Sequence, residues 1–153
     1  IRLNEEEISF LEQLPAAVDF CADGIRYGMT HLYREIEVIT SPHVFDRFVE
    51  ETFPENQDGL LTRLIVGHTH RLGVYYLNDT TLWLNAGSAS YRAQRDILSL
   101  SDPSQDAQYI TIVDGEIHLK RVAYGVASVY GEMKEHSVMD SEMEIAIRLF
   151  GPR

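Results

Sequence analysis

Residues 64–70 decide the fold of this chain, and they read Leu64-Ile65-Val66-Gly67-His68-Thr69-His70. The apolar, partly β-branched run at 64–66 is typical of a short buried strand. Gly67 lets the backbone leave that strand sharply, and the two histidines follow at once. Neutral imidazole is a good ligand for zinc, manganese, iron or nickel. We therefore expect a strand that carries two candidate metal ligands, His68 and His70, into a loop at its end.

The spacing of the two histidines leaves two geometries open. In a continuing strand, residues i and i+2 point to the same face. In a turn they diverge, so that each can serve a different metal ion. A histidine in a loop is more often a solvated or packed residue than a ligand. The context strengthens the metal interpretation, because a glycine, a predicted hairpin and a second loop, Asn85 to Ser88, surround the pair.

A third histidine follows another predicted strand. Residues 17–22 and 25–29 read as two strands joined by Asp23-Gly24, a dipeptide that is typical of a two-residue hairpin turn. His31 lies just beyond the second strand. Loops at strand ends are where α/β folds place their sites. His31 is therefore the third candidate ligand.

The other predicted elements alternate between helices and hairpins. Asn4 and Glu7 resemble a capping box at the start of a helix that Pro15 ends. Apolar residues at helical spacing predict a second helix over 43–53. Further strands are expected at 74–77, 80–84, 108–113 and 116–122, and a last helix is expected between Asp140 and Gly151-Pro152. Residues 92–107 are polar and turn-rich, which predicts an exposed loop.

The composition indicates a globular protein. The length of 153 residues and the apolar content of 44% suit one domain with a core, and we expect residues 1–153 to form a single unit. No apolar run is long enough for a membrane span, and the N-terminus has no signal-peptide pattern. The chain lacks an initiator Met, and we therefore expect it to have been cut from a longer protein. The one cysteine, Cys21, fits a reducing cytoplasm.

The formal net charge of −11 bears on the partners of the chain. Such a charge repels the phosphate backbone and argues against non-specific binding of nucleic acid. It is compatible with a small phosphorylated substrate, since bound divalent cations reverse the local sign of the charge.

The motifs resemble those of the calcineurin-like metallophosphoesterases, in particular the small bacterial and archaeal phosphodiesterase group. Residues 67–70 match its G-H-T-H signature, and Asn85-Ala86-Gly87-Ser88 is similar to its N-P-G-S loop. Leu14-Pro15, a hairpin and His31 resemble the L-P segment that leads to its H-G motif. Residues 117–124 are similar to its late strand ending in a tyrosine. The resemblance covers nearly the whole chain and maps onto the C-terminal half of the family domain.

This resemblance implies a fold and a metal site. The fold is α/β (α+β by some schemes), a four-layer α/β/β/α sandwich, of which this chain supplies a hairpin-rich mixed sheet with flanking helices. The site holds two divalent metal ions about a bridging aspartate, with manganese favoured over iron, zinc or nickel. His31 and His68 would bind one metal and His70 the other. The family's D-x-H, G-D and G-N-H motifs are absent from this sequence.

The function implied by the resemblance is metal-dependent hydrolysis of a phosphodiester or a phosphomonoester. A metal-bridging hydroxide attacks phosphorus, so no catalytic side chain from this chain is required. Asn85 and Ser88 are candidates for hydrogen bonds that orient the imidazoles. Arg92 is either a contact to the substrate phosphate or a solvated surface arginine. His118 and His136 are interpreted as structural, and His43 as a surface residue at a helix start, with a place at the mouth of the site as the alternative. Two departures are Leu32, where the family has glycine after the histidine, and Ala86 in place of proline.

Two other interpretations stay open. The first is a non-catalytic protein-binding module that keeps the metallophosphoesterase fold, as a retromer subunit does. The missing upstream motifs and Leu32 favour it. The second is that the segment pairs with a separate chain or with another copy of itself as a homo-oligomer, because a half-sandwich would expose apolar surface and sheet edges.

Overall fold

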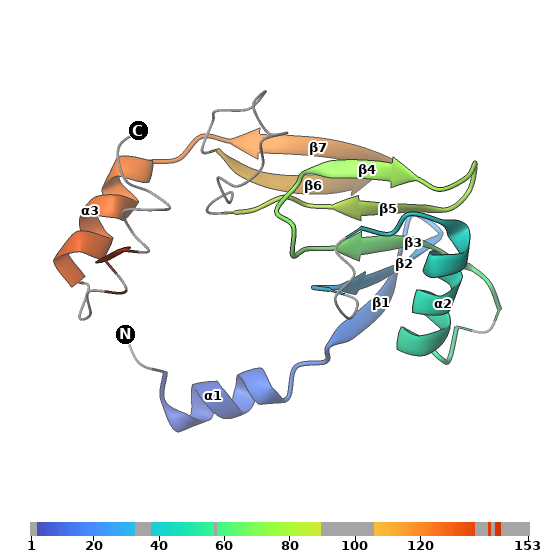
Figure 1. The fold of residues 1–153 in the computed structure, drawn as a ribbon, viewed down its shortest axis with the longest axis horizontal. Helices are drawn as coiled ribbons and strands as arrows, with labels where there is room; N and C mark the ends of the chain where they lie inside the picture. The colour runs from blue at the N-terminus through green and yellow to red at the C-terminus, as the bar shows by residue number, and fades with distance from the viewer. Residues whose placement is uncertain are drawn as a thin grey trace. The chain divides into compact units, whose positions relative to one another are not determined.

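The computed structural model describes residues 3–32, 38–56, 58–89, 106–136, 141 and 143–144 (Figure 1). Within these residues the elements follow one another in the order α1 (Glu5–Glu12), β1 (Ala17–Ala22), β2 (Ile25–Thr30), α2 (Pro42–Thr52), β3 (Leu61–Val66), β4 (Gly73–Tyr76), β5 (Leu82–Asn85), β6 (Ala107–Val113), β7 (Glu116–Val122) and α3 (Val126–His136). None of the described helices has the length and apolar character that crossing a lipid bilayer requires.

The strands form a mixed five-stranded sheet and a separate two-stranded sheet. The larger sheet has the order β1-β2-β3-β5-β4, and the smaller one is the β6-β7 hairpin. β1 and β2 are antiparallel, whereas β2 and β3 are parallel. The predicted α/β fold with a hairpin-rich mixed sheet is therefore confirmed.

The chain divides into two compact units. The first comprises residues 1–66 and 75–83, and the second comprises residues 67–74 and 84–153. Both β4 and β5 contribute residues to each unit.

The core of the first unit lies between α2 and the strands. Ser41 caps α2 by accepting a hydrogen bond from the Val44 amide, and Pro42 occupies the first turn. Phe45 and Phe48 lie on the same face of the helix because they are three residues apart, and both are buried. They belong to one apolar cluster, which consists of Ile39, Phe45, Phe48, Phe53, Leu61, Leu64, Val66 and Trp83.

Trp83 stabilises the cluster through one hydrogen bond and one aromatic stacking contact. Its indole Nε1 donates a 2.8 Å hydrogen bond to the carbonyl oxygen of Ile39, 44 residues away in sequence. Its ring stacks on Tyr75, with the ring centroids 4.1 Å apart. The buried indole N–H is therefore satisfied, as burial of a donor requires.

Two hairpins have the same turn chemistry. Asp23 and Gly24 between β1 and β2 have φ values of 51° and 75°, and Asp114 and Gly115 between β6 and β7 have values of 52° and 79°. Positive φ at both central residues is the geometry that matches the twist of a two-residue hairpin. The sequence predicts both turns, because Asp-Gly adopts this backbone readily.

The helix and strand ends differ in places from those predicted. β3 begins at Leu61 instead of Leu64, because residues 61–66 pair in parallel with β2 despite the polar Thr62 and Arg63. The capping box of Asn4 and Glu7 is present, but α1 ends at Glu12 and has no buried residue. The predicted last helix lies almost entirely outside the described residues.

Candidate functional site

The histidine loop, residues 67–70, follows β3 directly. His68 is exposed, and His70 is half-buried. The backbone of His70 has a φ of +56°, in the left-handed region that residues with a side chain rarely adopt. Such a conformation is unfavourable by about 1–2 kcal/mol and persists only where the surroundings fix it. The backbone therefore turns sharply between the two imidazoles and does not continue as a strand.

Asn85 holds the histidine loop. It is the last residue of β5, and its side chain is fully buried. Its Nδ2 donates hydrogen bonds to the carbonyl oxygen of Gly67 and, over 2.9 Å, to Oγ1 of Thr69. Its Oδ1 accepts a 2.9 Å hydrogen bond from the amide of Gly87. One buried amide therefore joins the histidine loop to the loop that begins at Asn85.

Ser88 and its neighbours connect this region to β6. Ser88 is buried, and its carbonyl oxygen accepts a 2.8 Å hydrogen bond from the amide of Gln108. Gly87 has a φ of +78° and packs against the Gln108 side chain. Sequence reasoning missed Gln108, because a glutamine within an alternating strand carries no signal of its own.

His31 is exposed and lies immediately after β2, as predicted. It belongs to the first unit, whereas the histidine loop belongs to the second. Its assignment with His68 as ligands of one metal therefore stays a prediction. Arg92 lies outside the described residues, and its contact to a substrate phosphate also stays a prediction.

The other three histidines lie on regular elements. His43 is exposed in α2, His118 is in β7, and His136 is exposed at the end of α3.

The described residues satisfy the requirements of a metal site only in part. Imidazoles on a fixed loop have the donor chemistry that transition metals and zinc prefer. A two-metal centre needs several ligands, however, and within the described ranges no three His, Cys, Asp or Glu side chains come together as a metal-holding group. The two-metal site therefore stays a prediction.

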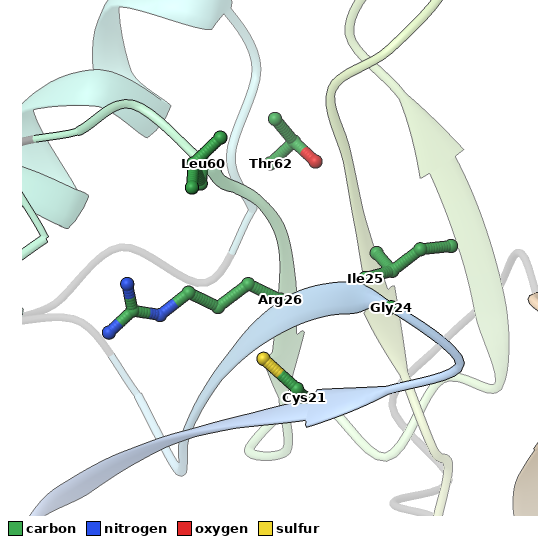
Figure 2. A pocket seen from close by; sticks show the side chains of 6 residues that line it. All are labelled: Cys21, Gly24, Ile25, Arg26, Leu60 and Thr62. Carbon is green, nitrogen blue, oxygen red and sulfur yellow. The ribbon is translucent and has the colours of Figure 1, made fainter.

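A cavity of about 330 Å³ in the first unit contains no predicted site residue. It lies beside the β1-β2 hairpin and the start of β3 (Figure 2), and it is lined by Cys21, Gly24, Ile25, Arg26, Leu60 and Thr62. Arg26 forms ion pairs with Asp19 at 2.7 Å and Asp58 at 3.4 Å. The hydrogen bond to Asp19 is the main cause that raises the pKa of the Arg26 guanidinium. The Arg26 guanidinium is therefore paired with the carboxylates of Asp19 and Asp58.

Comparison with solved structures identifies the fold. Neither the protein-family models nor the curated proteins give a match. A hypothetical protein from Pyrococcus horikoshii matches 97% of this chain with a TM-score of 0.61 and 11% identity. A metallophosphoesterase from Sphaerobacter thermophilus matches 98% with a TM-score of 0.57 and 20% identity. The chain spans 55% and 63% of their lengths. It therefore has a metallophosphoesterase-like fold, as the G-H-T-H and N-A-G-S motifs predict.

Proposed function

We propose that this chain is the histidine-bearing, C-terminal part of a metal-dependent phosphoesterase. The observation that carries the proposal is the histidine loop, in which Asn85 fixes the backbone of Gly67 and Thr69 and His70 adopts a left-handed conformation. A backbone that is held in an unfavourable conformation by a buried amide is typical of a functional site. The metallophosphoesterase-like fold supports the same interpretation.

In this proposal the imidazoles of His68, His70 and His31 are metal ligands, with manganese as the first candidate ion. When bound, a pair of divalent ions supplies a hydroxide nucleophile and neutralises charge on the phosphoryl group. Asn85 holds the loop that carries His68 and His70 through its bonds to Gly67 and Thr69. The carboxylate ligands come from a part of the domain other than the described residues.

The charge of the chain supports a role for cations in substrate binding. The net charge of −11 repels a phosphate ester at long range. A substrate of this class therefore requires local positive charge, which divalent ions at the histidine loop and Arg92 would provide. We propose a small phosphodiester or phosphomonoester as the substrate.

The test is hydrolysis of bis(p-nitrophenyl) phosphate by the full-length protein with added Mn²⁺. We expect turnover that falls by about 100-fold or more in His68→Ala and His70→Ala, because each change removes a direct ligand. His43→Ala is the matched control, since His43 is exposed on α2. A protein that folds but shows neither metal binding nor turnover dependent on the two histidines would overturn the proposal and favour the non-catalytic binding module.

A further inference from the structure

Gln108 packs against the loop that holds the histidines. It lies in β6 and is only 6% exposed. Its backbone amide donates to the carbonyl oxygen of Ser88. A Cβ atom placed on Gly87 would collide with Oε1 of Gln108 and would lie 2.6 Å from its Cβ. The Gln108 side chain and the Gly87 backbone are therefore in close contact, and only glycine fits at residue 87.

Burying the polar amide of Gln108 in this space is energetically unfavourable. Its Oε1 is buried and accepts no hydrogen bond from any side chain or backbone group of the described residues. Buried polar atoms in proteins nearly always have a partner, and one without a partner is unfavourable. A methionine would fill a similar volume without that penalty. Packing alone therefore does not account for a glutamine here.

Contacts lead from Gln108 to the histidines in three steps. Gln108 contacts Gly87, whose amide donates to Oδ1 of Asn85. That bond orients the Asn85 side chain so that its Nδ2 faces the histidine loop. All of these residues belong to the second unit. A displacement of Gly87 would therefore rotate the Asn85 amide away from Gly67 and Thr69.

We propose that Gln108 is a positioning residue for His68 and His70, acting through Gly87 and Asn85. The importance of this role for catalysis rests on the proposed function. The positioning itself does not, because it concerns the conformation of the histidine loop with no metal or substrate bound.

The experiment is NMR spectroscopy of the full-length protein labelled with ¹⁵N-glycine and ¹³C-histidine, without metal. Gln108→Ala should shift the amide signals of Gly67 and Gly87 and the ring signals of His68 and His70. The ring signals of His43 and His136 should not move, since these residues lie on α2 and α3. Unchanged ring signals of His68 and His70 in Gln108→Ala would overturn the proposal.

Gln108→Met separates the amide from its volume. If the amide positions the loop, this variant shifts the same His68 and His70 signals while its melting temperature equals or exceeds that of the wild type. If Gln108 only fills space, the spectrum of Gln108→Met is that of the wild type, which would overturn the role of the amide.

Gly87→Ala tests the contact from the other side. The new methyl group should displace the loop, and Gln108→Ala in the same chain should restore part of the wild-type spectrum by removing the collision. Gly24→Ala is the matched control, because Gly24 has a φ of +75° but no atom within 4 Å of the added Cβ. It carries the same backbone strain without the collision. Absence of any restoration in the double variant would contradict the contact path.

These outcomes are distinct from the outcome of the phosphoesterase assay. Shifted histidine signals in an inactive wild-type protein would leave the positioning intact and overturn the proposed function. Unshifted histidine signals in the Gln108 variants of an active enzyme would overturn the positioning and leave the proposed function intact.

Discussion

Asn85 and Thr69 lie 16 residues apart in sequence and are joined by a 2.9 Å hydrogen bond from Nδ2 to Oγ1. The same Nδ2 donates to the carbonyl oxygen of Gly67. Together the two hydrogen bonds fix the backbone and one side chain of the histidine loop. Asn85 is fully buried, and water cannot replace these bonds if the side chain is lost. The conformation of the loop therefore depends on a residue that is remote in sequence.

Replacing Asn85 by leucine should strongly destabilise the protein. Leucine has a similar volume but leaves the Gly67 carbonyl, the Thr69 hydroxyl and the Gly87 amide without their partner. We expect a loss of roughly 2–4 kcal/mol in the free energy of unfolding, from unsatisfied buried groups. Urea denaturation measures it. Asn78→Ala is the control with a smaller loss, because Asn78 caps an exposed turn. Equal losses in the two variants would contradict the importance of burial.

Gly28→Ala should destabilise the first unit. A Cβ at this position would lie 2.8 Å from the Phe53 ring and 2.9 Å from Cδ2 of Leu64, in the apolar cluster. Overpacking of this kind typically reduces stability by about 1–3 kcal/mol. Gly131→Ala should have the opposite sign, since Gly131 lies in α3 with open space around it and alanine favours a helix by about 1 kcal/mol. Thermal unfolding of both variants measures the difference, and a stabilised Gly28→Ala would refute the predicted collision.

Trp83 provides a spectroscopic test of the core. It is the one tryptophan of the chain and is 2% exposed, so its emission should be blue-shifted in the folded protein and should move to the red on unfolding. Trp83→Phe removes the hydrogen bond to Ile39 and part of the stacking on Tyr75. We expect a loss of about 1–3 kcal/mol, as for other buried groups left without a partner. Native emission like that of free tryptophan would contradict the burial.

The Arg26 ion pairs should not make stability depend on pH near neutrality. The pKa of the Arg26 guanidinium is raised above its ordinary value, chiefly by its hydrogen bond to Asp19. A raised pKa in the folded state gives a contribution that is complete below the unfolded-state pKa and is lost only as pH rises through the folded value. The stability difference between wild type and Arg26→Gln should therefore be constant between roughly pH 6 and pH 9, and should shrink with salt. A difference that varies with pH in this range would contradict the assignment.

The sequence predicts those features that depend on neighbouring residues. The Asp-Gly turns, the capping box of Asn4 and Glu7, and the buried face of α2 all follow from local backbone preferences and periodicity. The early start of β3 could not be predicted in this way. Its polar residues are accommodated by pairing with β2, where Arg63 donates to the Tyr27 hydroxyl and its guanidinium lies over the ring.

Local sequence patterns likewise predict only part of the candidate site. The motif predicts His68 and His70 as a pair, and the resemblance indicates a role for Asn85, because both are encoded in short stretches. The contact of Gln108 with Gly87 joins a strand to a loop about twenty residues earlier, and only the tertiary structure brings them together. The ligand set that would complete a metal site is likewise a tertiary relationship, and no pattern within a single stretch determines it.

The proposed role of the histidine loop is tested most directly by the metal content of the full-length protein after dialysis against Mn²⁺, measured by atomic spectroscopy for wild type, His70→Ala and His43→Ala. We expect bound metal in wild type and in His43→Ala, and an affinity weaker by about 100-fold or more in His70→Ala, since even the partners that orient a ligand change affinity by about 10- to 100-fold. Equal metal content in all three folded proteins, or no bound metal in the wild type, would contradict it.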